Sequence, residues 1–291
     1  MALVPALVAY PHETEIRLAV FGDWGCGGER QRVLKGALEQ YASAEGFHAG
    51  LLLGDNFYPD GVSSVDDPLW EDRFESGLAT EPLGRTRWFA VLGDHDYRGN
   101  TAAQIHYTAI SRGGWSMPTH FYRVDFVAAG QAPVLTLLAI DTHKKCSRWR
   151  QQVQWLESQL KALAGSRRHV VVMGHNPAVS YSRHGGQKQV NDRIVPLLER
   201  YDVALYLCGD DHNMQMIQRN NANYAVVGSA CQQLYRVHDG PGQLFGQKKQ
   251  GFAVLRVTAE RLGLEFRDTE GNVLYTWDHG EPGTKSPDHQ Q

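Results

Sequence analysis

The chain has 291 residues, of which 42% are hydrophobic, and a formal net charge of -3 at pH 7. This length and composition suit a globular protein with a large core. The slightly acidic balance argues against nucleic acid and membrane surfaces as partners, because such binding usually needs a basic face. No apolar run approaches the roughly 18 residues that span a bilayer. The first ten residues lack the basic start and long apolar stretch of a signal peptide, so none is expected.

The first regular elements are expected from residue 16 onward. Ile16 to Phe21 is predicted to be a strand, residues 29–41 an amphipathic helix and residues 48–53 a second strand. A strand–helix–strand start of this kind predicts a parallel pair with a right-handed crossover.

The middle of the chain alternates between strands and helices. Strands are expected at residues 88–92, 134–140, 170–173 and 203–207, and helices at 70–78, 150–163 and 190–201. Residues 97–122 are expected to be irregular, and residues 180–189 form a polar loop.

The last third is expected to be antiparallel, because its predicted strands follow one another without helices. These strands are residues 224–227, 252–257, 262–266 and 273–277. Residues from about 280 onward are polar and are expected to be disordered. With no internal repeat and no linker, a single domain over 1–291 is expected, with its core at about 16–278 and extensions at 1–14 and 280–291.

Five of the predicted strands end in a glycine that is followed by a metal-binding side chain. The five turns are Gly22-Asp23, Gly54-Asp55, Gly93-Asp94-His95, Gly174-His175 and Gly209-Asp210-Asp211-His212. One Gly-Asp turn alone is ordinary loop chemistry. Because ligands sit beyond the carboxyl ends of strands in open α/β sheets, all five turns are expected to gather at one edge, with each glycine permitting a sharp turn. The repetition therefore predicts a multinuclear metal site.

These five blocks resemble those of the metallophosphoesterases. The segment Gly54-Asp55-Asn56-Phe57-Tyr58, with a tyrosine three residues after the aspartate, narrows the resemblance to the small, tartrate-resistant purple acid phosphatases. The match runs in order from about residue 16 to residue 277. It implies an α/β fold, a four-layer αββα sandwich of two mixed β-sheets, with a dimetal site at the C-terminal strand edges.

The resemblance also implies a role for each site residue. The first ion, ferric in the family, would be held by Asp23, Asp55, Tyr58 and His212, with Asp55 bridging the two ions. The second ion (Fe, Mn, Mg or Zn) would be held by Asp55, Asp94, His175 and Asp210. His95 and His184 fall where the family has catalytic histidines that contact the phosphate or the leaving-group oxygen.

Two of these positions depart from the family, and both serve the second ion. The family has asparagine at the position of Asp94 and histidine at the position of Asp210. The two extra carboxylates would neutralise a ferric–divalent pair. We therefore expect a preference for Mg, Mn or iron over zinc, weaker acidification of bound water, and carboxylates that titrate high when no metal is bound.

Other polar residues have weaker motif support. Asp96, Asp141 and Asp211 are expected to be supporting or turn-forming acids rather than ligands. His106, His120, His143 and His169 are expected to be structural. The basic cluster at residues 144–150 is interpreted as a solvated face, with attraction of an anionic substrate as the alternative.

The four cysteines, Cys26, Cys146, Cys208 and Cys231, match no zinc spacing and are expected to be buried or loop thiols. Secreted members of the similar family pair a cysteine at the position of Cys146 with one where this chain has Gln189. The expected lack of that disulfide favours the cytoplasm. A secreted or periplasmic location would require a processed N-terminus.

The expected function is a dimetal phosphomonoesterase of the purple acid phosphatase type, in which a metal-bound hydroxide attacks a small phosphorylated substrate. The alternatives are a phosphodiesterase or nucleotide phosphatase on the same site, and a degenerate metal-binding protein in which Asp94 and Asp210 prevent hydrolysis. The presence of Asp55, Tyr58 and His175 favours the enzyme, because a degenerate protein would tend to lose these residues too. The patterns define neither the natural substrate nor the oligomeric state.

Overall fold

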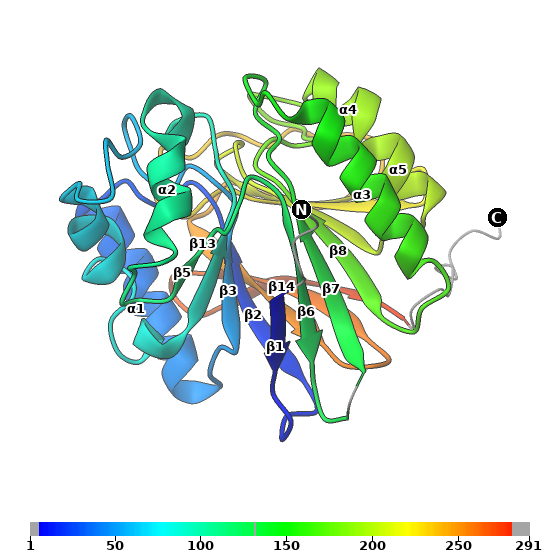
Figure 1. Ribbon diagram of the computed structural model, residues 1–291, viewed down its shortest axis with the longest axis horizontal. Coiled ribbons are helices and arrows are strands. Elements are labelled where there is room, and N and C mark those ends of the chain that lie inside the picture. The colour runs from blue at the N-terminus through cyan, green and yellow to red at the C-terminus, as the bar shows by residue number, and fades with distance from the viewer. Residues whose placement is uncertain (1–5, 131, 281–291) are drawn as a thin grey trace.

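The computed structural model describes residues 6–130 and 132–280. Two mixed β-sheets pack face to face (Figure 1). Helices α1 (Gly28–Ala44) and α2 (Thr101–Tyr107) lie outside one sheet, and α3 (Trp149–Leu163), α4 (Lys188–Arg193) and α5 (Val195–Arg200) lie outside the other. The layers therefore run helix, sheet, sheet, helix, as predicted from the sequence.

The first sheet has seven strands in the order β15-β14-β13-β2-β3-β4-β5. Their bounds are β2 Ile16–Phe21, β3 Ala49–Leu52, β4 Arg87–Ala90, β5 Trp115–Ser116, β13 Gly251–Val257, β14 Leu262–Asp268 and β15 Val273–His279. Strands β2 to β5 are parallel to one another, which confirms the predicted strand–helix–strand start. The other neighbours are antiparallel, as expected for the last third of the chain.

The second sheet has eight strands in the order β1-β6-β7-β8-β9-β11-β10-β12. Their bounds are β1 Ala6–Ala9, β6 Tyr122–Val127, β7 Pro133–Ala139, β8 His169–Met173, β9 Leu205–Cys208, β10 Met214–Arg219, β11 Ala222–Val227 and β12 Gln243–Gln247. Its centre, β7-β8-β9-β11, is parallel. Both sheets therefore contain a parallel group whose carboxyl ends can carry ligands.

The helices lie between strands and over the outer faces of the sheets. They are α1 Gly28–Ala44, α2 Thr101–Tyr107, α3 Trp149–Leu163, α4 Lys188–Arg193 and α5 Val195–Arg200, with short turns at Trp70–Glu75, Leu83–Arg85 and Asp96–Arg98. Helix α3 buries Leu156, Leu160 and Leu163. These three residues lie within the helix predicted at residues 150–163, and they pack on the outer face of the second sheet.

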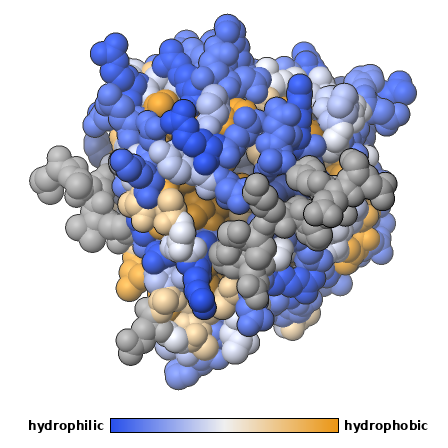
Figure 2. Space-filling model, turned by 90° about the vertical axis from the view of Figure 1, so that its right-hand side faces the viewer, coloured by the Kyte–Doolittle hydropathy of each residue, from blue (hydrophilic) through white to orange (hydrophobic). Residues whose placement is uncertain are grey.

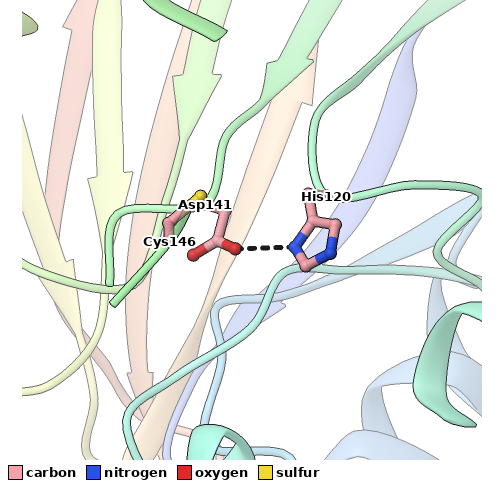
Figure 3. Close-up of side chains that lie close together, drawn as sticks. All are labelled: His120, Asp141 and Cys146. Carbon is pink, nitrogen blue, oxygen red and sulfur yellow. Dashed lines mark hydrogen bonds and ion pairs between the residues drawn. The ribbon is translucent and has the colours of Figure 1, made fainter. Parts of the chain in front are cut away.

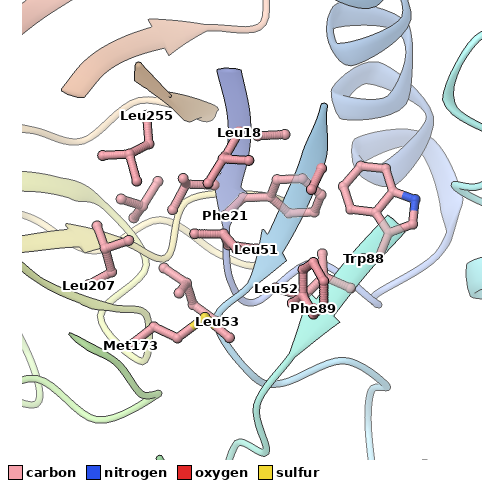
Figure 4. Close-up of a cluster of buried hydrophobic side chains, with 14 of the residues drawn as sticks. Leu18, Phe21, Leu51, Leu52, Leu53, Trp88, Phe89, Met173, Leu207 and Leu255 are labelled. Atoms are coloured by element: carbon pink, nitrogen blue, oxygen red, sulfur yellow. The ribbon is translucent and has the colours of Figure 1, made fainter. Parts of the chain in front are cut away.

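The main hydrophobic core lies between the two sheets. In Figure 4, Met173 and Leu207 of the second sheet lie in the same buried cluster as Leu255 of the first sheet and Leu53, which directly follows β3. All four side chains are fully buried. Because close-packed side chains leave little room for adjustment, this core fixes the position of one sheet relative to the other.

Three sequence predictions about elements were wrong. Residues 97–122 are only partly irregular, since they contain α2 and β5, and Asn100 caps α2 by accepting a hydrogen bond from the Ala103 N–H (3.2 Å). The Tyr107 ring of α2 stacks on Trp70, with ring centroids 3.6 Å apart. The helix expected at 190–201 is divided into α4 and α5 at Ile194, close to Pro196, which has no N–H to donate.

The helix expected at residues 70–78 is only the short π-helical turn Trp70–Glu75. Strands β1, β5, β6, β10 and β12 were not predicted. The segment expected to be disordered, from about residue 280, lies almost entirely outside the described residues.

The face of the molecule turned toward the viewer in Figure 2 is mostly hydrophilic, with hydrophobic residues in small groups. Among the described residues, the structure contains no helix with the length and apolarity needed to cross a membrane.

Candidate metal centre

The five Gly-Asp/His turns meet at one place between the two sheets. Asp23, Asp55 and Asp94 follow β2, β3 and β4 of the first sheet, whereas His175 and Asp210 follow β8 and β9 of the second. The sequence suggested one edge of one sheet. The structure instead joins the carboxyl ends of two parallel strand groups, which brings ligands from opposite sides.

Most of the glycines before the candidate ligands are needed because a Cβ atom at these positions would collide with neighbouring atoms. The left-handed backbone conformation falls on three candidate ligands, with φ of 60° at Asp23, 51° at Asp55 and 66° at Asp210, and on one of the glycines, Gly54, with φ of 88°. Aspartate tolerates this conformation better than most residues. A Cβ at Gly93 would lie 2.2 Å from the Asp55 carboxylate, and one at Gly209 would lie 2.5 Å from that of Asp23. The expected turn-forming role of glycine therefore holds at Gly54, whereas Gly93 and Gly209 allow close packing against carboxylates.

His175 lies at the middle of the cluster and is fully buried. Its Nδ1 is 2.8 Å from the main-chain oxygen of Leu53, which can only accept, so Nδ1 carries the proton. Its Nε2 has no hydrogen-bond partner among the described residues. That nitrogen lies 3.6 Å from Asp55, 3.5 Å from Asp94 and 3.8 Å from Asp210, in each case to Oδ1. A bare imidazole nitrogen that faces three carboxylate oxygens is a donor set for a divalent cation.

A second group of oxygen and nitrogen donors surrounds Asp23. The Tyr58 hydroxyl donates to Asp23 Oδ1 (3.1 Å) and Asp55 Oδ2 (2.8 Å). His212 Nε2 is 3.3 Å from Asp23 Oδ1, while its Nδ1 is 2.9 Å from the main-chain oxygen of Gln233. Asp55 thus directs one oxygen to each group. The residues present fit two ions, with Asp55 between them.

The pKa values of the cluster reflect burial and crowding of like charges. Burial, together with the charges of Asp23 and Asp94, raises the pKa of Asp55 well above its usual value, although His175 opposes the shift. Burial also raises the pKa of Asp210. These directions agree with the expectation that some carboxylates titrate high without metal. Asp94 behaves oppositely: burial acts to raise the pKa of its carboxyl, but contact with His175 and the charges of His95 and Arg98 together lower it.

Both carboxylates that depart from the similar family have a neighbouring polar partner. Arg98 lies 3.3 Å from Asp94, four residues earlier in the chain. Asn176 donates from Nδ2 to Asp210 Oδ2 (2.9 Å). Arg98 and Asn176 were not identified as site residues from the sequence. Two signals in the sequence could have identified them. Arg98 comes four residues after Asp94, and Asn176 directly follows His175.

The two histidines expected to contact substrate differ in their surroundings. His95 packs on the Tyr58 ring at 4.2 Å between centroids, and its Nε2 is 4.0 Å from Asp55 Oδ2. His184 is exposed and lines a cavity of about 750 Å³ together with Asp94 and Asp210. Both side chains lie beside the candidate ligand cluster. The His95 ring is held by its contact with Tyr58, whereas the His184 ring faces the cavity.

Asp96 is a buried carboxylate that joins two of the turns. It accepts hydrogen bonds from the N–H groups of Gly93 (2.8 Å) and Asn56 (3.1 Å) and from Gln104 Nε2 (2.8 Å). These bonds tie the turn after β3 to the turn after β4. Asp96 therefore positions Asp55 and Asp94 without being part of either donor set.

One sequence prediction about the cysteines was wrong. Cys26 and Cys231 form a disulfide across 205 residues of sequence, whereas Cys146 and Cys208 are free and buried, as predicted. The Cys231 N–H donates to the main-chain oxygen of Asp23 (3.2 Å). The bond thus ties the Asp23 turn to the segment that carries Tyr235, whose ring stacks on His212 at 4.3 Å. Sequence spacing gave no signal for this pairing, because only the fold brings residues 26 and 231 together.

A separate cluster consists of His120, Asp141 and Cys146, whose donor atoms lie within 4.8 Å of one another (Figure 3). His120 Nδ1 lies 2.8 Å from Asp141 Oδ2, and the Tyr97 hydroxyl donates to the same oxygen (2.5 Å). The His143 N–H donates to the other oxygen (3.2 Å). Because hydrogen bonds already occupy the carboxylate, this cluster has a structural role.

A two-sheet αββα sandwich with aspartate and histidine side chains gathered at the strand ends of both sheets defines the class of the metallophosphoesterases. The sequence model of the calcineurin-like phosphoesterase family matches residues 16–214. The chain belongs to this family, and it is a hydrolase of the purple acid phosphatase-like type.

Named relatives agree with this assignment. The chain is 30% identical to tartrate-resistant acid phosphatase type 5 of Oryctolagus cuniculus, over 89% of either chain. It is 28% identical to purple acid phosphatase 7 of Arabidopsis thaliana, over 88% of this chain and 83% of the relative. Among solved structures, it is similar to GAP50, the anchor in the inner membrane complex of Plasmodium, with a TM-score of 0.84 and 25% identity over 94% of this chain and 91% of that one.

Proposed function

We propose that the protein is a dimetal phosphomonoesterase that hydrolyses small phosphorylated molecules. The observation that carries this proposal is the unpartnered Nε2 of buried His175, which faces carboxylate oxygens of Asp55, Asp94 and Asp210. A buried imidazole nitrogen without a partner is costly unless something binds it.

Each ligand group would hold one ion. Asp23, Asp55, Tyr58 and His212 would hold the first, with iron proposed there because the tyrosine oxygen is a ligand suited to ferric ion. Asp55, Asp94, His175 and Asp210 would hold the second. Bound there, two ions would bind the phosphoryl oxygens and lower the pKa of a water molecule toward neutrality.

The side chains beside the ligand groups would orient the substrate and move protons. His95 stands next to Tyr58 and Asp55, where it would hydrogen-bond to a phosphoryl or leaving-group oxygen. His184 would approach the leaving group from the cavity. The leaving-group oxygen needs a proton, and an imidazole supplies one efficiently near neutral pH.

The proposal is tested with protein purified without chelators, by metal analysis, a visible spectrum and a p-nitrophenyl phosphate assay. We expect about two ions per chain, turnover, and a broad visible band from tyrosinate bound to ferric iron. The Tyr58→Phe variant should lose the band. The variant Tyr235→Phe is the matched control, because its ring stacks on His212 but its hydroxyl is not in the ligand group. Two bound ions without turnover of any phosphomonoester would contradict the proposal.

A second candidate is a metal-binding protein without hydrolytic activity. Asp94 and Asp210 favour it, because two extra carboxylates would reduce the positive charge available to a phosphate dianion. The structural relative GAP50 is named as an anchor. The variant Asp94→Asn/Asp210→His separates the candidates, with Asp192→Asn as a control that removes an exposed carboxylate of the same cavity. Activity only in the double variant would support the second candidate, and activity in the unaltered protein would exclude it.

The disulfide between Cys26 and Cys231 bears on the compartment. Disulfides form and persist in oxidising environments. We therefore infer an oxidising compartment for the folded protein, in place of the cytoplasm expected from the sequence.

A further inference from the structure

The cavity beside the ligand cluster has a wall rich in positive charge. Asp94, Asp210 and His184 line it on the side of the cluster. Its cationic lining residues are Arg98, Lys144, Lys145, Lys188 and Arg193. A substrate whose scissile phosphate is bound at the metal site that Asp94 and Asp210 would form would therefore extend past these cationic side chains.

Three of these cations form no ion pair with a carboxylate of the described residues: Lys144, Lys145 and Arg193, whose guanidinium lies over the Trp149 ring at 5.6 Å from its centroid. Arg98 pairs with Asp94 at 3.3 Å and Lys188 pairs with Asp192 at 2.6 Å, whereas no carboxylate in the described part of the chain pairs with Lys144 or Lys145. Both lysines are exposed. Their ammonium groups are therefore free to bind an anion in the cavity.

The loop that carries the two lysines, residues 141–146, is held firmly at its base. The Asp141 main-chain N–H donates to Gln152 Oε1 (3.1 Å), and the Asp141 main-chain oxygen accepts from Gln152 Nε2 (2.7 Å). The oxygen of His143 accepts from the Cys146 N–H (2.9 Å) and from Trp149 Nε1 (3.0 Å). The hydrogen bond between His120 and Asp141 in Figure 3 fixes the same base.

The loop is also tied to the ligand cluster. Thr142 Oγ1 accepts hydrogen bonds from the N–H groups of His175 (3.1 Å) and Asn176 (2.9 Å). Lys144 and Lys145 come two and three residues after Thr142, so their backbone has a fixed position relative to His175 and Asp210. A preorganised position reduces the entropy lost on binding.

We propose that Lys144 and Lys145 form a second anion subsite, and that the preferred substrates are small molecules with a second phosphate next to the one that is cleaved. This inference rests on the proposed phosphomonoesterase function. A phosphate offers oxygens that accept from ammonium donors. With a nucleoside diphosphate, water forms the new bond to the terminal phosphorus and the bond to the bridging oxygen breaks. The products are orthophosphate and the monophosphate, whose phosphate remains at the lysines, and one proton is released to solvent.

The test compares kcat/KM of the metal-loaded enzyme for a nucleoside 5′-diphosphate and for p-nitrophenyl phosphate. The variant Lys144→Ala/Lys145→Ala should lose about tenfold for the diphosphate, since two exposed charge contacts are removed. It should change little for p-nitrophenyl phosphate. The control is Lys161→Ala/Lys248→Ala, which removes the same charge from exposed positions outside the cavity lining. Equal losses for both substrates, or no loss, would overturn the inference and leave the proposed function intact. An acidic phosphopeptide is assayed as a third substrate. If Lys144→Ala/Lys145→Ala lowers kcat/KM for the phosphopeptide alone, the inference is also overturned.

If neither substrate is turned over, the proposed function fails and the subsite is judged by binding. Calorimetry would then compare inorganic pyrophosphate with orthophosphate on the metal-loaded protein. Tighter binding of pyrophosphate that disappears in Lys144→Ala/Lys145→Ala would support the subsite. Equal affinity for both anions would overturn it.

Discussion

His175 donates its Nδ1 proton to the main-chain oxygen of Leu53, 2.8 Å away and 122 residues earlier in the chain. This bond links the end of β8 in one sheet to the end of β3 in the other, at the point where the ligands meet. It fixes the tautomer in which Nε2 is the free nitrogen. The relative position of the two sheets therefore decides which nitrogen faces the carboxylates.

Replacing His175 should remove metal from one ligand group. We expect the variant His175→Ala to bind its second ion more than about 100-fold more weakly, since loss of a ligand exceeds the usual effect of losing a residue that only supports one. Metal analysis after dialysis at stepped free-metal concentrations measures this. His106→Ala, an exposed histidine on α2, is the control and should keep both ions. Unchanged metal content in His175→Ala would remove this residue from the ligand set.

Replacing Asp96 should loosen two turns at once. The variant Asp96→Asn keeps the shape but places an amide donor opposite the N–H groups of Gly93 and Asn56. We expect a loss of about 1–3 kcal/mol in the free energy of unfolding and weaker metal binding. Urea unfolding and metal titration check both effects. The substitution Asp239→Asn at an exposed position should change neither the free energy of unfolding nor metal binding. If Asp96→Asn changed them as little, this carboxylate would not position the turns.

Removing the disulfide should destabilise the fold. The variant Cys26→Ala/Cys231→Ala is expected to lose about 2–4 kcal/mol in the free energy of unfolding, because the bond closes a very long loop. Replacement of the free Cys208 serves as the control for loss of a buried sulfur. When the unaltered protein is unfolded without reductant, Cys146 and Cys208 should react with an alkylating agent. Reaction of Cys26 and Cys231 as well would show that the bond is not formed.

The two histidines beside the ligands should affect turnover rather than metal content. We expect His95→Ala to lower kcat by roughly 100-fold or more, which is the usual contribution of a positioned proton-transfer group, with both ions retained. His184→Ala should raise KM as well, because this side chain lies on the cavity wall. His238→Ala, at an exposed position, is the control. Loss of metal in His95→Ala would instead indicate a structural role through its contact with Tyr58.

His169 should make stability depend on pH. Burial, with a contribution from nearby His279, lowers the pKa of His169 to about 4. Since the unfolded chain takes up the proton at its ordinary pKa, stability is complete above about pH 6.5 and falls as the pH drops toward 4. Between pH 7 and pH 4.5 the unaltered protein should lose roughly 2 kcal/mol more unfolding free energy than His169→Gln. Parallel pH curves for the two proteins would show that His169 does not titrate in this way.

The sequence by itself, through the family resemblance of its five blocks, indicated the αββα fold and the residues that gather at the candidate metal centre. Glycine followed by aspartate or histidine at five strand ends is a local pattern. Because the carboxyl ends of parallel strands lie at the same edge of a sheet, these strand ends are expected to lie together. The order of the turns, with Tyr58 three residues after Asp55, was sufficient to indicate the family that the matching family model and the named relatives show.

Only the tertiary structure decided how the two sheets meet, and with that several features of the site. The tautomer of His175, the contact of Arg98 with Asp94 and the disulfide between Cys26 and Cys231 each depend on segments that pack together in space. The fixed position of the Lys144–Lys145 loop depends on hydrogen bonds from the turn after β8. Local patterns report the propensity and chemistry of neighbouring residues, whereas distances between distant segments follow from core packing, in which no single short stretch of sequence carries the information.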